Sequence, residues 1–151
     1  MQPKSFLKTL KFIHTSFLIG LVIVTFFAFW QQNSFIAEMD ADDFLIYAVP
    51  VLAAIGYFVS QWLFQKMVKG IGKEEPISNK LGAYRTASII KYALIEGPAL
   101  FASAAYYLNG NALHLVIGIF MVFYLFRQRP SRQKIETALP LTREEKMGLF
   151  G

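Results

Sequence analysis

Four apolar segments, separated by shorter polar stretches, dominate the chain and predict an all-α protein of membrane-spanning helices. The expected spans cover residues 12–30, 44–65, 86–108 and 111–127. About 20 apolar residues are needed for a helix to cross ~30 Å of hydrocarbon. The first two segments reach that length without a charge, whereas the third contains Glu96 and the fourth is short. The pattern predicts a single-domain integral membrane protein, folded as an antiparallel four-helix bundle.

The charged residues give this bundle an expected orientation. All fifteen Lys and Arg residues lie before the first segment, between the second and third, or after the fourth. The loop after the first segment carries only acidic charges, and the loop 109–111 is uncharged. Because cytoplasmic loops of membrane proteins are enriched in Lys and Arg, both termini are expected in the cytoplasm of a bacterial inner membrane. Topology therefore explains the net charge of +5, and no nucleic-acid partner is needed.

Composition narrows the chemistry. Hydrophobic residues make up 55% of the chain and charged residues 17%, against about 25% charged in soluble domains. The chain has no cysteine, and its two histidines, His14 and His114, are expected near opposite membrane faces. No Ser–His–acid set and no phosphate-cradling loop is present. We expect no catalytic residue, no metal site and no cofactor, so the protein is interpreted as a non-enzyme.

Residues 128–151 are expected to form a basic cytoplasmic tail. The run closest to the membrane carries Arg127, Arg129, Arg132 and Lys134. Such residues attract anionic lipid headgroups with about 1 kcal/mol each near the surface; the alternative interpretation is a topology anchor. Farther on, Thr142 and Glu145 have the spacing of a capping box. A short surface helix is predicted there, lying on the membrane or against a partner.

The segment 86–108 carries most of the candidate chemistry. At 100° per residue, four polar side chains lie within about 40° of Glu96 on one helix face; they are Arg85, Tyr92, Ser103 and Tyr107. Carboxylates inside membrane segments are rare and usually face the bundle interior or a water-filled cavity. We expect this stripe to line the inside of the bundle.

Depth counting suggests partners for Glu96. Gln61 and His14 are expected in the same cytoplasmic third of the membrane, so Glu96, Tyr92, Gln61 and His14 are predicted to form one polar cluster. Pro98 has no N–H and frees the carbonyl of Leu94 from its helix hydrogen bond. A carboxylate beside a freed carbonyl is suited to handling a proton or a small cation.

The stretch Ala93–Leu100, with the sequence ALIEGPAL, resembles the carboxylate helix of rotary ATP synthase c-subunits (proteolipids). That family has an Ala-Leu-x-Glu core followed by small and aliphatic residues, and the resemblance implies that Glu96 is an ion-carrying carboxylate. The chain departs from the family before this stretch, because segment 44–65 has Gly56 where the family helix is rich in glycine. The whole pattern is also similar to small, uncharacterised four-span bacterial inner-membrane proteins, which implies no activity.

Three functions follow from these observations. The first is a non-catalytic subunit or scaffold that packs against other membrane subunits or its own copies, with Glu96 as interhelical glue worth about 0.6 kcal/mol per hydrogen bond. The second is a proton or cation conductor that depends on Glu96. The third is a binder of lipid or a hydrophobic ligand. The substitution Glu96→Gln separates the first two, because it is nearly silent in a scaffold and abolishes conduction.

Overall fold

The computed structural model describes residues 5–150, and in this range the chain is all-helical. The helices are α1 (Phe6–Gln32), α2 (Leu45–Lys69), α3 (Ile77–Asn109), α4 (Ala112–Arg127), α5 (Arg132–Ala138) and α6 (Arg143–Phe150). The first four correspond to the predicted segments. The largest difference is at α3, which begins nine residues earlier than the predicted span 86–108.

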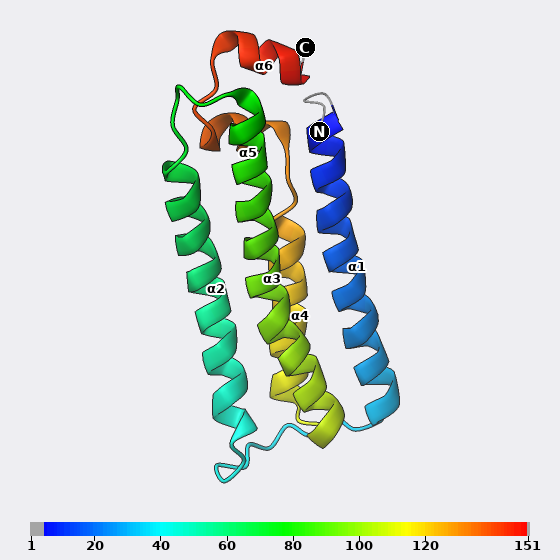
Figure 1. The fold of residues 1–151 in the computed structure, drawn as a ribbon. Helices are drawn as coiled ribbons and strands as arrows, with labels where there is room; N and C mark the ends of the chain where they lie inside the picture. Colours follow the sequence, from blue (N-terminus) through cyan, green and yellow to red (C-terminus); the bar gives the residue numbers. More distant parts are fainter. Residues whose placement is uncertain (1–4, 151) are drawn as a thin grey trace.

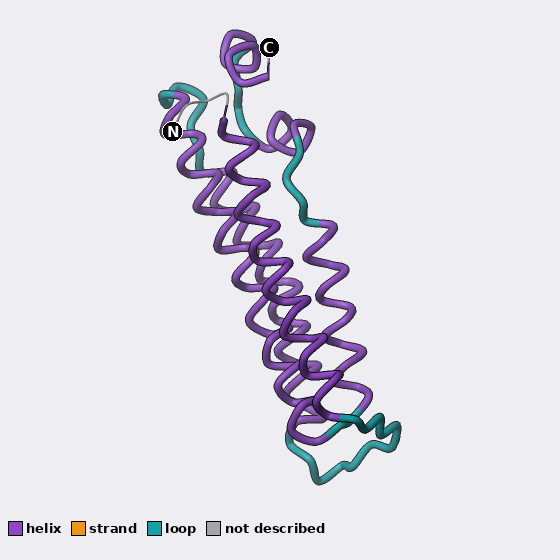
Figure 2. The backbone as a smooth tube through the Cα atoms, turned by 90° about the vertical axis from the view of Figure 1, so that its right-hand side faces the viewer, coloured by secondary structure: helices purple, strands orange, loops and turns teal. Residues whose placement is uncertain are grey.

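The four long helices lie side by side, and each runs opposite to the one before it in the chain (Figure 1). Seen from the side, their axes follow one direction and the connections gather at the two ends (Figure 2). The start of α1, the end of α2, the start of α3 and the end of α4 share one end with α5 and α6. We call this the basic end, because it carries the Lys and Arg residues, and we call the opposite end the acidic end.

Length and composition make α1 and α2 candidate membrane spans. Between the basic and acidic ends, their outward faces expose large apolar side chains such as Phe26, Phe58 and Trp62, at 59–66% of their full area. A third candidate arises only if α4 and α5, which are bent by 79° at the break between them, count as one span. Two apolar helices are compatible with a membrane protein, and the four-span topology remains a prediction.

A close approach between helices joins α2 to α3. A Cβ atom on Gly56 would lie 2.6 Å from the backbone oxygen of Leu94 and 2.7 Å from Cγ of Pro98. Only glycine therefore fits at this point of α2. The Leu94 carbonyl, which Pro98 leaves without an N–H donor, faces the α2 backbone.

Small residues of α3 also admit α1 and α4. Ser103 is buried, and its hydroxyl forms a 2.9 Å hydrogen bond with the hydroxyl of Thr25 on α1. A Cβ atom on Gly118 of α4 would lie 3.4 Å from the same Ser103 oxygen. His14 of α1 connects directly to α4, with 2.7 Å between its Nε2 and the backbone oxygen of Leu125.

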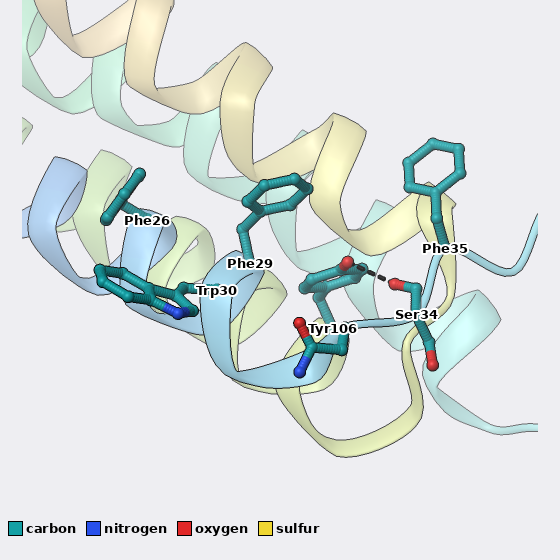
Figure 3. A pocket seen from close by; sticks show the side chains of 7 residues that line it. Phe26, Phe29, Trp30, Ser34, Phe35 and Tyr106 are labelled. Carbon is teal, nitrogen blue, oxygen red and sulfur yellow. Dashed lines mark hydrogen bonds between the residues drawn. The ribbon is translucent and has the colours of Figure 1, made fainter.

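At the acidic end, the loop between α1 and α2 is fastened to the turn between α3 and α4. The Ile36 N–H donates to the Gly110 carbonyl at 2.9 Å, and the Ala112 N–H donates to the Ile36 carbonyl at 2.7 Å. Beside this link, a surface pocket of about 370 Å³ opens among the aromatic residues that end α1 (Figure 3). The buried Tyr106 forms one wall of it and donates its hydroxyl hydrogen to the Ser34 carbonyl.

The tail after α4 folds back over the basic end of the bundle. Ile135 of α5 and Leu149 of α6 are buried in a cluster with Phe6 of α1 and Leu81 of α3. Figure 1 shows both short helices lying across this end. The prediction of a helix after Thr142 is confirmed, but the surface it covers is the chain's own.

The contact between α2 and α3 gives a stability prediction. Gly56→Ala must push the two helices apart, because its Cβ would overlap backbone and proline atoms, and overpacking of this kind costs about 1–3 kcal/mol. Thermal unfolding of the purified protein in detergent should show a lower midpoint.

The control is Gly82→Ala on α3, where an added Cβ has no atom within 4 Å. Alanine favours helix over glycine by about 1 kcal/mol, so this variant should be as stable as the original protein or more so. Equal midpoints for the two variants would contradict the close approach at Gly56.

Candidate functional site

Glu96 lies in the seam between α1 and α3, half-buried rather than enclosed. A Cβ atom on Gly20 of α1 would lie 3.7 Å from its Oε1, so the carboxyl group rests against the α1 backbone. No described residue forms a hydrogen bond or an ion pair with it. The Leu94 carbonyl faces α2 instead, so the predicted pairing of carboxylate and freed carbonyl does not form.

The predicted polar stripe of α3 divides between interior and surface. Tyr92 and Ser103 are each 1% exposed, as expected for inward positions. Arg85 is exposed and Tyr107 is 48% exposed, so the prediction that they line the bundle interior is wrong. The buried phenol at the acidic end belongs to the next residue, Tyr106. Arg85 and Ser103 lie 18 residues, or about five turns, apart and so share one angle around α3. One is exposed and the other buried, so the stripe is split because the surroundings of α3 change along its length.

His14 and Tyr92 do meet, as predicted. Their ring centroids are 5.0 Å apart in an edge-on contact, and both residues are 1% exposed. The His14 ring also contacts the Leu125 carbonyl of α4. Lys91, the residue before Tyr92, is 8% exposed, and its Nζ lies 4.0 Å from the centre of the Phe64 ring.

Gln61 is paired elsewhere. Its amide donates to the hydroxyl of Tyr124 on α4 at 2.6 Å, so it joins α2 to α4. The four residues predicted to form one cluster therefore occupy three places: Glu96 on the α1–α3 seam, His14 with Tyr92 in the interior, and Gln61 between α2 and α4. The polar groups are arranged as helix-to-helix contacts, and no continuous file joins them.

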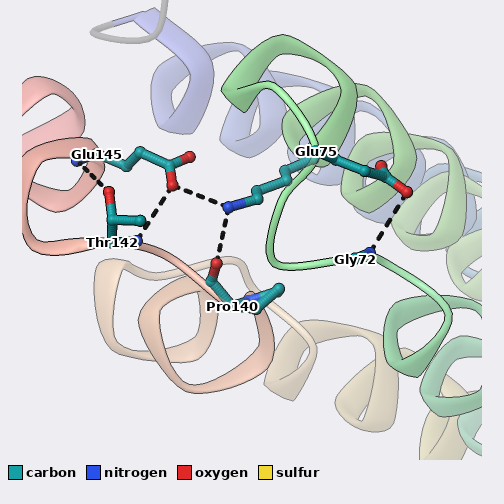
Figure 4. A network of polar contacts seen from close by, with 6 residues as sticks. Gly72, Glu75, Pro140, Thr142 and Glu145 are labelled. Carbon is teal, nitrogen blue, oxygen red and sulfur yellow. Dashed lines mark hydrogen bonds and ion pairs between the residues drawn. The ribbon is translucent and has the colours of Figure 1, made fainter.

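A buried ion pair holds the tail against the basic end (Figure 4). Lys80 of α3 is fully buried and donates at 2.8 Å both to the Pro140 carbonyl and to Glu145 of α6. Glu145 also accepts from the Thr142 N–H at 3.2 Å, and its own N–H donates to the Thr142 hydroxyl. One carboxylate thus completes the predicted capping box and neutralises a buried cation.

Sequence reasoning missed the ion pair because its two halves lie 65 residues apart. Lys80 stands in a stretch whose glycines and proline indicate a flexible connector, and Glu145 already had a role in the capping box. A single lysine at the start of a helix gives no sign that it is buried.

The basic run after α4 has mixed contacts. Arg127 and Arg129 are exposed, and Arg132 pairs with Glu136 one turn along α5 at 2.9 Å. Lys134 donates to the carbonyls of Arg127 and Arg129, at 2.8 and 2.7 Å, and so satisfies the end of α4. A surface hollow of about 590 Å³ between α2 and α4 is lined by Arg127 and Lys134 together with Gln61, Tyr124 and aromatic residues. Lipid-headgroup binding by this run stays a prediction.

Within residues 5–150, no three His, Cys, Asp or Glu side chains lie close enough to hold a metal ion. Comparison of the chain with protein-family models, with curated proteins and with solved structures finds no match.

The Lys80–Glu145 ion pair predicts that the packing of α6 against the basic end depends on pH. Burial raises the pKa of the Glu145 carboxyl. The hydrogen bonds from Lys80 and Thr142, together with the Lys80 charge, lower it by more than burial raises it, so the net pKa lies below its ordinary value of 4.5. Because the folded pKa is depressed, the stabilisation is complete above the unfolded pKa and is lost as the pH falls through the folded one. Hydrogen exchange of the α6 amides should therefore accelerate in that acidic window.

Glu145→Gln keeps an acceptor for Thr142 but removes the charge opposite the fully buried Lys80. Faster α6 exchange is expected at neutral pH, corresponding to about 1–3 kcal/mol of lost protection. The matched control is Glu136→Gln, which removes an exposed pair worth about 0.5 kcal/mol at most. Equal exchange in the two variants would show that Lys80 does not hold the tail.

Proposed function

We propose that this protein is a non-catalytic, four-span subunit of a bacterial inner-membrane assembly, with both termini in the cytoplasm. The arrangement of charge supports this topology. Fifteen basic residues flank the helix ends that meet at the basic end, and the loop at the other end carries Glu38, Asp40, Asp42 and Asp43. This is the distribution that the positive-inside rule favours.

The observation that carries the proposal is the unpaired Glu96 on the outer seam of α1 and α3. A carboxyl group facing hydrocarbon without a hydrogen-bond partner is costly, whether ionised or neutral. Its own chain offers the α1 backbone at Gly20 and no described donor. The missing partner is therefore proposed to come from another molecule.

The surface around Glu96 suits a close helix contact. Ala93 and Gly97 are both exposed on α3, and a Cβ atom on Gly97 would have no atom within 4 Å. Small residues four positions apart let helix backbones approach closely in membranes. Because both residues are exposed and an added Cβ on Gly97 meets no atom, this surface can receive a helix from outside.

The proposed occupant is a transmembrane helix of a different subunit that carries a hydrogen-bond donor opposite Glu96. A two-fold pairing of identical chains centred on Glu96 would bring two carboxyl groups together, and they could share a hydrogen bond only with one of them protonated. The conduction hypothesis has less support, because Gln61 and the freed Leu94 carbonyl, two of the groups predicted to assist Glu96, face α4 and α2.

The test uses Gly97→Leu, which places a large side chain on the exposed surface beside Glu96, where an added Cβ has no atom within 4 Å. We expect the original protein to migrate as a larger assembly when extracted from its native membrane in mild detergent, and Gly97→Leu to migrate as a folded monomer. Gly82→Leu is the matched control on the same helix, and it should stay in the assembly. Extraction of the original protein as a lone monomer would refute the proposal.

Cross-linking then identifies the occupant. The chain has no cysteine, so Ala93→Cys introduces a unique thiol for a short cross-linker. A product with a second, different protein is expected, whereas a product of twice the chain's own mass would contradict a different subunit. Glu96→Gln, which still donates and accepts hydrogen bonds, should retain the assembly, and Glu96→Leu should weaken it.

A further inference from the structure

A hollow of about 330 Å³ lies at the basic end between α2, α3 and α5. Its lining offers three kinds of hydrogen-bond donor: two ammonium groups, one amide and two hydroxyls. The rest of the lining is apolar. The lining residues are Phe64, Tyr84, Lys91, Gln133, Lys134, Thr137 and Ala138, and none of these is acidic. Such a lining is positive and rich in donors, which is the chemistry that binds an anion.

Lys91 is the residue that most needs a ligand here. It is 8% exposed, and no described carbonyl, hydroxyl or carboxylate accepts a hydrogen bond from its Nζ. The ammonium lies 4.0 Å from the centre of the Phe64 ring and 5.8 Å from that of Tyr92. Aromatic faces attract a cation, but they leave all three of its N–H donors without an acceptor.

Lys134 brings a second positive charge to the same hollow. Two of its N–H groups are used by the carbonyls of Arg127 and Arg129, so one donor remains for a ligand. Its charge repels that of Lys91. Two ammonium groups that repel each other around an open volume are stabilised together by one anion placed between them.

We propose that this hollow binds a phosphoryl group, with the buried Lys91 and the exposed Lys134 as its cations and the hydroxyls of Tyr84 and Thr137 as further donors. The group has two sources with the same chemistry, the headgroup of an anionic phospholipid or a free phosphate compound. Lys91 lies near the expected cytoplasmic boundary of the span 86–108, the depth at which lipid phosphates are found. The site is separate from the Glu96 seam and does not depend on a partner helix.

The experiment has one arm for each source. In the first, thermal unfolding of the purified protein in neutral detergent is followed with inorganic phosphate, against sodium chloride at equal ionic strength. In the second, native mass spectrometry measures retention of phosphatidylglycerol against phosphatidylcholine. Lys91→Met should lower the affinity for the effective probe by about tenfold or more, because it removes a charge-assisted hydrogen bond.

Two variants control for charge and folding. Lys66→Met removes an equal charge from α2, where the lysine is exposed and lies 5.0 Å from the centre of the Trp62 ring; it should keep the binding. Lys91→Arg preserves the cation and should bind measurably better than Lys91→Met.

Stabilisation by inorganic phosphate that Lys91→Met removes supports a site for a free phosphate compound. Selective retention of phosphatidylglycerol that Lys91→Met removes supports a lipid headgroup site. The proposal is overturned if neither probe exceeds its reference, or if Lys66→Met reduces binding as much as Lys91→Met.

Discussion

Packing around α3 is the constraint on which the rest of the structure depends. The other three long helices all contact it, and they do so where its side chains are small: Ala99 and Ala102 are fully buried, and Ala105 is 2% exposed. Backbones approach closely at such positions, as Gly56 shows on α2. Because α1, α2 and α4 occupy most of the circumference of α3, one outer strip remains uncovered. Ala93 and Gly97 are exposed on that strip, and Glu96 lies at its border with α1.

The same packing explains why the basic end is closed by the tail. The helix α3 extends beyond the predicted span to Ile77, and its first turns present Leu81 and Tyr84 to apolar residues of α5 and α6. Lys80 would be a buried unpaired charge in this position, at a cost of several kcal/mol. Glu145 removes that cost by forming an ion pair with Lys80. Lys91, more than two turns farther along α3, has no such partner, and the hollow beside it stays open.

Sequence patterns located the helices well and their contacts poorly. An apolar run indicates where a helix lies along the chain, and each of the four predicted segments falls on one of α1 to α4. The helices extend beyond the apolar runs, because α1 and α3 begin six and nine residues earlier and α2 ends four residues later. Angular position around α3 correctly predicted that Tyr92 and Ser103 are buried. The same prediction was wrong for Arg85 and Tyr107, which are exposed. Helical periodicity reports which residues share a face of one helix, and it does not report how many neighbours surround that helix. Depth counting failed for Gln61 in the same way, because residues at equal depth on different helices need not face each other.

Two charged side chains of α3, Glu96 and Lys91, have no hydrogen-bond or ion-pair partner among the described residues. The buried atoms His114 Nδ1 and Glu145 Oε2 also lack a partner, whereas several polar groups between the helices are paired. Thr25 pairs with Ser103, Gln61 with Tyr124, and His14 with a carbonyl of α4. Glu96 and Lys91 differ from these paired groups, and they lie on different surfaces of the bundle. Pairing them with each other would require both to lie on one face of α3, but five residues apart they stand about 140° from each other around the helix. We therefore propose that each finds its partner outside the chain: a hydrogen-bond donor for Glu96 and an anion for Lys91.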